Sequence, residues 1–90
     1  MARRKHKLVS EMYGGESYEY YPLGEHIVSA PGVCGGRPTF KHTRIDVHHA
    51  MALLSGGWTI DAVAQSYRVP VEAVQEAIDL AVTALYKQAG

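Results

Sequence analysis

Residues 46–78, DVHHAMALLSGGWTIDAVAQSYRVPVEAVQEAI, decide the fold. In the first part of this stretch, apolar residues recur at the i, i+3, i+4, i+7 spacing that is typical of an amphipathic helix. These residues are Val47, Ala50, Met51 and Leu54. Asp46 precedes them as an N-cap residue, and two glycines, Gly56 and Gly57, follow as a stop signal. We therefore expect a helix that begins after Asp46 and ends before Gly56.

The same spacing occurs twice more further along the chain. Thr59 is suited to cap a second helix, and the apolar residues of that helix are Ile60, Val63, Ala64 and Tyr67. A third, longer helix is marked by Val71, Val74, Ala77, Ile78, Ala81, Val82 and Leu85. Between them, Pro70 disfavours helix in the residue before it, so Arg68–Pro70 forms a short connection. Three helices with one apolar stripe each close a small core, and the last two have a helix-turn-helix layout.

The chain ahead of the helices predicts short extended segments. His26–Val28 suits one strand, and Thr39–Ile45, rich in β-branched and aromatic residues, suits a second, with a glycine-rich turn between them. Residues 1–24 form a partly flexible arm with an extended, tyrosine-rich segment. We therefore divide the chain into an N-terminal arm (1–24) and a helix-turn-helix-like domain (25–90). The expected fold class is mainly α, a three-helix bundle preceded by a small β hairpin and the arm.

Length and composition indicate one small globular domain. The chain has 90 residues, of which 47% are hydrophobic. Because a domain of this size buries only a thin core, we expect it to gain stability as a homodimer. No apolar run approaches the ~20 residues that cross a bilayer. The single cysteine, Cys34, suits a reducing compartment, so we expect a cytoplasmic protein with no membrane segment.

The net charge is zero, but basic residues concentrate before Ile45 and acidic residues after it. We therefore expect any contact with DNA to lie in the basic half, because lysine and arginine side chains that contact phosphates supply most of the affinity for nucleic acids. The candidate DNA-contacting residues are Arg37, Lys41, His42 and Arg44, with Arg3 and Arg4 of the arm and Gln75 of the third helix. A basic two-stranded ribbon fits the major groove, and a basic arm reaches the minor groove. The same charges equally suit the soluble edge of a small sheet.

The third helix itself argues against simple major-groove reading. Its outward residues are expected to be Glu72, Gln75, Glu76 and Asp79. Glutamine reads adenine, but carboxylates repel phosphates.

The tyrosines of the arm are candidates for a protein contact. Tyr18, Tyr20 and Tyr21 are suited to dock on a dimer partner or another protein, because tyrosine is enriched at protein interfaces. A partly ordered tail is the plainer alternative for the start of the arm.

No pattern of catalytic or metal-ligating residues emerges. His48 and His49 are adjacent on a helix and point apart, and with His42 and Cys34 they lack the spacing of a zinc site. Cys34 has no orienting third group of the kind that nucleophilic catalysis requires. The glycines match neither of the common phosphate-binding loops. We therefore expect no metal, no cofactor and no enzymatic activity.

One string and its surroundings form a family signature. Gly36–Val47 reads GRPTFKHTRIDV, and it is flanked by Pro31–Gly35 (PGVCG) and Gly57–Val63 (GWTIDAV). Over roughly residues 25–82, the chain resembles the domain of unknown function 433 (DUF433) family of predicted VapB-type antitoxins, whose signature is G-x-P followed by G-T-R-I-x-V. Two positions depart from the pattern. His42 stands where the signature has glycine, and Pro70 stands where a threonine or serine cap is usual.

The resemblance implies a homodimeric, homeodomain-like bundle that acts as an antitoxin. Such a protein neutralises a PIN-like ribonuclease and binds double-stranded DNA to repress its own operon. The alternative is a protein-interaction module that acts as a homodimer and does not bind DNA. The acidic third helix favours this alternative.

Overall fold

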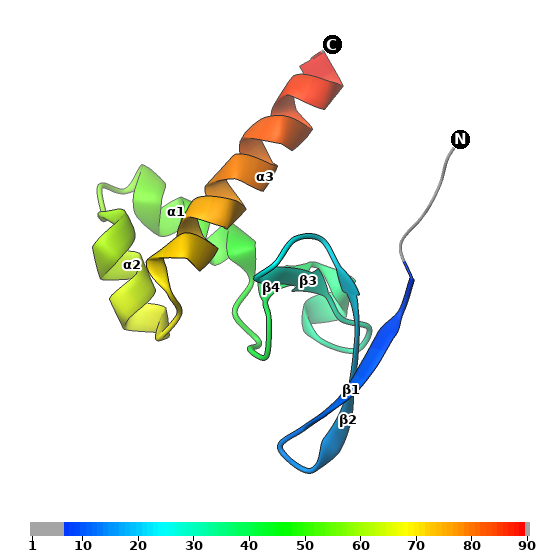
Figure 1. The fold of residues 1–90 in the computed structure, drawn as a ribbon. Helices are drawn as coiled ribbons and strands as arrows, with labels where there is room; N and C mark the ends of the chain where they lie inside the picture. The colour runs from blue at the N-terminus through cyan, green and yellow to red at the C-terminus, as the bar shows by residue number, and fades with distance from the viewer. Residues whose placement is uncertain (1–6, 90) are drawn as a thin grey trace.

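A computed structural model describes residues 7–89, in which an antiparallel sheet is followed by three helices (Figure 1). The strands are β1 (Val9–Tyr13), β2 (Glu16–Pro22), β3 (Ile27–Ser29) and β4 (Pro38–Phe40), and a 3-10 helix, η1 (Cys34–Gly36), precedes β4. The helices are α1 (Val47–Ser55), α2 (Ile60–Tyr67) and α3 (Val71–Ala89). Within the described range, no helix is long and apolar enough to cross a membrane.

The helices begin where the sequence predicts them because side chains cap their first turns. Asp46 Oδ1 accepts a hydrogen bond from the amide of His48 (2.8 Å), and Thr59 Oγ1 accepts one from the amide of Ala62 (3.1 Å). Helix α2 ends at Tyr67, and the next residue, Arg68, is its C-cap with a left-handed φ of 59°. The three predicted helices and the short α2–α3 connection are therefore confirmed.

The sheet is larger than the sequence analysis predicted. Its four antiparallel strands have the order β1-β2-β3-β4, and β1 and β2 form a hairpin in which Val9 pairs with Tyr20. The two turn residues, Gly14 and Gly15, have φ values of 63° and 82°. Glycine adopts these angles without steric cost, and they match the tight turns that join hairpin strands. The expectation of a mainly α fold was therefore wrong for this half, and the chain is mixed α/β with a helical C-terminal half.

The second predicted strand, Thr39–Ile45, is mostly a turn. Strand β4 ends at Phe40, and His42 has a left-handed φ of 66°. Thr43 closes the turn, since its amide (3.0 Å) and its Oγ1 (2.7 Å) both donate to the carbonyl oxygen of Phe40. The prediction of an extended ribbon through Arg44 was therefore wrong, because the backbone reverses at the position where the family signature has glycine.

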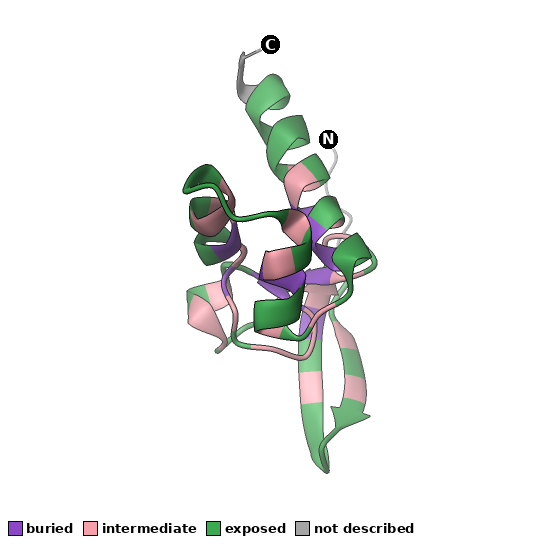
Figure 2. Cartoon of the chain, turned by 90° about the vertical axis from the view of Figure 1, so that its left-hand side faces the viewer, coloured by how far each residue is buried: buried purple, intermediate pink, exposed green. Residues whose placement is uncertain are grey.

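The core lies between the helices and the β3–β4 pair (Figure 2). Its buried side chains are Ile27, Phe40, Ala50, Val63, Ala64, Ala73, Val74 and Ala77. A smaller cluster contains Tyr20, Val28 and Ala30. Since side chains alternate along a strand, Ile27 and Val28 serve different clusters on the two faces of the sheet.

Helix α3 contributes to the core only along its first half. Its last buried residue is Ala77, whereas Ala81, Val82 and Leu85 are exposed although their spacing placed them on the apolar stripe. In Figure 1 the C-terminal half of α3 projects beyond the other helices. The apolar stripe of α3 is therefore longer than the body that covers it.

Candidate functional site

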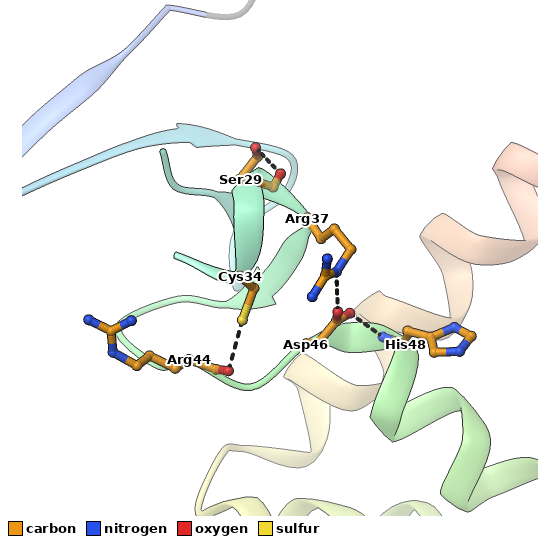
Figure 3. A network of polar contacts seen from close by, with 7 residues as sticks. Ser29, Cys34, Arg37, Arg44, Asp46 and His48 are labelled. Carbon is orange, nitrogen blue, oxygen red and sulfur yellow. Dashed lines mark hydrogen bonds and ion pairs between the residues drawn. The ribbon is translucent and has the colours of Figure 1, made fainter. Parts of the chain in front are cut away.

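An ion pair at the start of α1 holds the first of the predicted DNA-contacting residues. Arg37 Nε donates to Asp46 Oδ2 at 2.7 Å, while Asp46 also caps α1 through the amide of His48 (Figure 3). The hydrogen bond from Arg37, followed by that from the amide of His48, lowers the pKa of Asp46, and the same pair raises the pKa of Arg37. The Arg37 side chain is still 65% exposed. One edge of its guanidinium is therefore engaged and the rest faces solvent.

Lys41 and His42 lie together beside Glu11 of the hairpin. Glu11 Oε1 is 3.0 Å from His42 Nε2 and 3.9 Å from Lys41 Nζ, and Glu11 Oε2 accepts from the Tyr20 hydroxyl at 2.9 Å. The His42 contact, then the Tyr20 contact, lowers the pKa of Glu11. The amide of His42 donates to the Tyr18 hydroxyl (3.0 Å). We name this set, Glu11, Tyr18, Tyr20, Lys41 and His42, the hairpin anchor.

The hairpin anchor uses side chains that the sequence assigned to external partners. Tyr20 is buried, and its ring lies 5.0 Å from Lys41 Nζ. A hydrogen bond with Tyr20 raises the pKa of Lys41. Tyr21, in contrast, is only half-buried and pairs with Ser29 of β3. Two of the three tyrosines therefore fix the hairpin to its own domain.

His42 keeps the backbone bend despite replacing the glycine of the signature. A positive φ is costly for a residue with a Cβ, and it persists where surrounding contacts hold it. The His42 ring stacks on Tyr13 with ring centres 3.9 Å apart and planes 4° apart. Its contacts with Glu11 and Tyr18 add to this restraint. The unusual conformation is therefore tied to the docking of the hairpin.

Arg44 lines a small recess beside His42 and Tyr18 of the hairpin anchor, whereas Gln75 lies on α3. The Arg44 side chain is exposed and points away from the polar network, although its carbonyl oxygen accepts from Cys34 Sγ at 3.1 Å (Figure 3). No carboxylate of residues 7–89 forms an ion pair with it. Gln75 is exposed on α3, and its Nε2 donates to Asp79 Oδ1 at 3.0 Å. Of the predicted DNA-contacting residues, the structure therefore brings together Lys41, His42 and Arg44. Arg37 is paired with Asp46, Gln75 lies on α3, and Arg3 and Arg4 lie outside the described residues.

The polar face of α3 has a structural task as well. Both Glu76 carboxylate oxygens accept backbone hydrogen bonds, from the amides of Glu25 and His26, at 2.6 Å each. This contact ties α3 to the loop between β2 and β3. The other predicted outward residues, Glu72, Gln75 and Asp79, are exposed. Because the exposed carboxylates Glu72 and Asp79 are anionic and no cation accompanies them among these side chains, this face of α3 repels phosphates.

The histidines that the structure describes do not converge on a metal position. Among the residues that the structure describes, no group of three or more histidine, cysteine, aspartate or glutamate side chains is arranged to hold a metal ion. The rings of His48 and His49 are 6.5 Å apart and tilted by 52°. Both residues are exposed at the start of α1.

An open groove of about 830 Å³ lies beside α3. The α3 side supplies Ala77, Leu80, Ala81 and Ala84. The opposite side and the floor are formed by Leu23, Ile27, Arg37, Pro38, Asp46, Val47, His48 and His49. Most of these side chains are apolar, and the polar ones belong to the Arg37–Asp46 pair and the two histidines. The groove therefore has the chemistry of a site for an apolar partner.

Sequence reasoning did not find this groove, although one signal was present. Residues 80–86, LAVTALY, contain no charged side chain over nearly two helical turns. The exposed fractions are 44% for Val82, 63% for Leu85 and 72% for Tyr86. A solvent-facing helix usually carries charges on its outer side. The lack of charge therefore marks a segment suited to burial against another surface.

These features define the class of protein as a small mixed α/β domain with an N-terminal antiparallel sheet, three C-terminal helices and exposed apolar surfaces. The chain belongs to the family described as "Protein of unknown function (DUF433)", which matches residues 27–81, more than half of its length. The resemblance noted in the sequence is thereby confirmed. No curated protein and no solved structure matches the chain. Strands β1 and β2 precede the family match, so the hairpin is an addition to the matched region.

Proposed function

We propose that this chain is a non-enzymatic, protein-binding domain of antitoxin type and that a PIN-like ribonuclease is its partner. The observation that carries the proposal is the placement of the exposed apolar side chains. Among the described residues, six of the eight large ones lie on or beside the hairpin and on the end of α3, and the other two are Trp58 and Val71. The hairpin and the end of α3 are the elements that project from the body in Figure 1. On and beside β1, the exposed fractions are 45% for Leu8, 72% for Met12 and 53% for Tyr13. Clustered apolar side chains on a surface are typical of protein interaction sites.

The hairpin is the element best suited to the ribonuclease. Strand β1 is at the end of the strand order, and within the described chain no strand pairs with its outer edge. An extended segment of a partner adds to such an edge through main-chain hydrogen bonds, while neighbouring side chains supply specificity. Met12 and Tyr13 supply apolar contacts at the hairpin tip. The family resemblance supplies the class of the partner, since it implies an antitoxin of a PIN-like ribonuclease.

Binding to double-stranded DNA, with repression of its own operon, is the second candidate function. The short turn between α2 and α3 favours it, because helix-turn-helix proteins read DNA with the second helix of such a pair. The charges favour the protein-binding candidate. Lys41 and His42 contact Glu11, and the exposed face of α3 is acidic.

The direct test mixes the purified chain with a PIN-like ribonuclease, taken from the neighbouring gene where that gene encodes one. Calorimetry measures binding and an RNA cleavage assay measures neutralisation. We expect a complex that inhibits cleavage, and we expect Met12→Asp to weaken it about tenfold or more because the carboxylate loses water at the interface. The matched control is Gln65→Asp, an exposed position on α2, which lies away from the hairpin in Figure 1.

Three results would contradict the proposal. They are the absence of a complex, a complex that leaves RNA cleavage unchanged, and equal affinities for the wild type and Met12→Asp. The DNA candidate has a separate test, fluorescence anisotropy with the upstream duplex and a scrambled duplex at low and moderate salt. If DNA is bound, Arg44→Ala should weaken binding and flatten its salt dependence.

A further inference from the structure

A small recess of about 230 Å³ lies between the hairpin and the turn that follows β4. Three of its lining side chains are aromatic rings, one is a guanidinium and one is apolar. The lining residues are Tyr13, Tyr18, Val33, His42, Thr43 and Arg44. Pockets for drug-sized ligands usually exceed about 300 Å³, so this recess has room for one flat group and not for a large cofactor.

The rings give the recess flat walls. The Tyr13 and His42 rings stack with centres 3.9 Å apart and planes 4° apart. The Tyr18 ring is tilted by 51° against Tyr13 and by 47° against His42. Tyr13 is 53% exposed, so part of its side chain remains available to a ligand. Aromatic side chains bind the bases of single-stranded nucleic acids by stacking, because every base has a π face.

Hydrogen bonds hold the walls of the recess in place. The amide of His42 donates to the Tyr18 hydroxyl at 3.0 Å, which joins the turn to the hairpin. On the other side, Cys34 Sγ donates to the carbonyl oxygen of Arg44 at 3.1 Å and fixes the backbone there (Figure 3). The recess is therefore formed before a ligand enters, and a preformed site loses less free energy to ordering on binding.

Two polar groups at the recess have hydrogen-bonding capacity left over. The Arg44 guanidinium forms no ion pair and no hydrogen bond within residues 7–89, and it points away from the polar network in Figure 3. The Tyr18 hydroxyl accepts from the His42 amide, and its own proton is given to no acceptor among the described residues. A guanidinium binds a phosphate through two parallel N–H bonds, and a hydroxyl adds a third donor.

The local charge also suits a phosphate. None of the residues that line the recess is acidic. The Glu11 carboxylate beside it is offset by Lys41 at 3.9 Å and contacts His42 at 3.0 Å. Glu16, which pairs with Tyr13 in the hairpin, does not line the recess. Arg44 therefore sets the sign of the charge at its mouth.

We propose that the recess holds one unpaired nucleotide, with its base against the aromatic walls and its phosphate on Arg44. A carboxylate alone would use the guanidinium but not the three rings, whereas a nucleotide uses both. The bases of a duplex are stacked and paired, so none enters such a recess unless it is flipped out of the helix. The inference goes beyond the proposed function, because this ligand binds the chain alone and needs no ribonuclease.

The test is fluorescence anisotropy of the full-length chain with labelled oligothymidine and oligouridine strands of about ten nucleotides. The comparison probes are a strand of the same length with abasic sites in place of the bases and a duplex of oligothymidine with oligoadenosine. We expect each base-bearing single strand to bind about tenfold or more tightly than either comparison probe, because only these strands offer a free base for stacking. Competition with unlabelled thymidine monophosphate identifies the source of the nucleotide. Displacement by the monophosphate at the concentration of the competing strand assigns the recess to a free nucleotide, and displacement only at much higher concentration assigns it to a single strand.

One pair of variants tests the phosphate contact. Arg44→Asn should raise the dissociation constant about tenfold, because a hydrogen-bonded ion pair is lost, and should reduce the salt slope by about 0.7. The side chain of Arg44 is exposed, so the circular dichroism signal should be unchanged. The matched control is Arg68→Asn, which removes the same charge after α2, away from the hairpin in Figure 1. Asparagine tolerates the left-handed φ of this position, so the control should fold and bind like the wild type.

Several outcomes would overturn the inference. They are the absence of binding, equal affinities for base-bearing and abasic strands, and an Arg44→Asn variant that binds like the wild type. Tighter binding of the duplex would also overturn it and would support the double-stranded DNA candidate instead. Inhibition of the ribonuclease without nucleotide binding leaves only the proposed function standing. Nucleotide binding without a ribonuclease complex leaves only this inference standing.

Discussion

The carboxylate of Asp46 has two tasks at the start of α1, so its replacement tests how the helical half is fixed to the sheet. One oxygen caps the helix through the amide of His48, and the other accepts from Arg37 Nε. Replacing an N-cap aspartate by alanine costs about 1–2 kcal/mol. For a chain of this length, that loss corresponds to a fall in melting temperature of roughly 5–15 °C. We therefore expect Asp46→Ala to fold but to melt within that range below the wild type.

Two comparisons separate the cap from the charge. Asparagine caps helices about as well as aspartate, so Asp46→Asn should lose less than about half of what Asp46→Ala loses. The pKa of Asp46 is lowered in the folded chain, so its contribution is fully present above the unfolded pKa of about 3.9. That contribution is lost as the pH falls through the lower, folded pKa. The stability difference between wild type and Asp46→Ala should therefore be full at pH 7 and shrink below pH 4.

Thermal and urea unfolding, followed by circular dichroism at neutral and acid pH, measure these differences. An Asp46→Asn variant as unstable as Asp46→Ala would show that the charge, and not the cap, dominates. A stability difference that stays constant down to the lowest pH would show that the ionised carboxylate contributes nothing. Thr59→Ala is a useful reference, because it removes the cap of α2, which forms without an ion pair.

Three further predictions concern the contacts that hold the hairpin and α3 in place. The lowered pKa of Glu11 means that its stabilisation of the hairpin is present above about pH 4.5 and is lost as the pH falls further. The protection factors of the β1 and β2 amides, which correct for the slower intrinsic exchange in acid, should therefore fall at acid pH, and Glu11→Gln should lose this pH dependence. His42→Gly should relieve the positive φ but remove the ring contacts that hold the hairpin. Amide protection should therefore fall in β1 and β2, while the melting temperature of the helices changes little. An equal loss of amide protection in the sheet and in the helices would contradict this prediction. Glu76→Ala should cost about 1–3 kcal/mol in urea unfolding, because the amides of Glu25 and His26 lose their acceptors; an unchanged midpoint would show that water replaces the carboxylate fully.

The helices were predictable because their signals are local. Asp46 and Thr59 bond to amides two and three residues ahead, so each cap needs only its own segment of chain. The hairpin also had a local signal, the adjacent glycines Gly14 and Gly15 between short β-prone runs, but the sequence analysis predicted only a partly flexible arm there. The turn at His42 was harder to predict. A histidine seldom takes a positive φ, and the contacts that hold it come from Glu11 and Tyr18, far away in the sequence.

The groove and the use of the basic residues depend on contacts between distant elements. Arg37 is nine residues from Asp46, and Lys41 is thirty residues from Glu11, so charge counting along the chain could not show that they would meet. The groove exists because α3 continues beyond the body, past the start of α1. Only the uncharged run from Leu80 to Tyr86 indicated it, since a helix end without charges requires a covering partner.

The two projecting elements can be tested separately. In Figure 1 the tip of the hairpin and the end of α3 point in opposite directions from the body. Met12→Asp, on the hairpin, should therefore weaken ribonuclease binding, whereas Leu85→Glu, on the exposed end of α3, should leave it unchanged. A loss of ribonuclease binding in Leu85→Glu would show that α3 also contacts the ribonuclease. The family match of residues 27–81 leaves out both the hairpin and the end of α3 that carries Leu85, so neither exposed apolar surface belongs to the matched region.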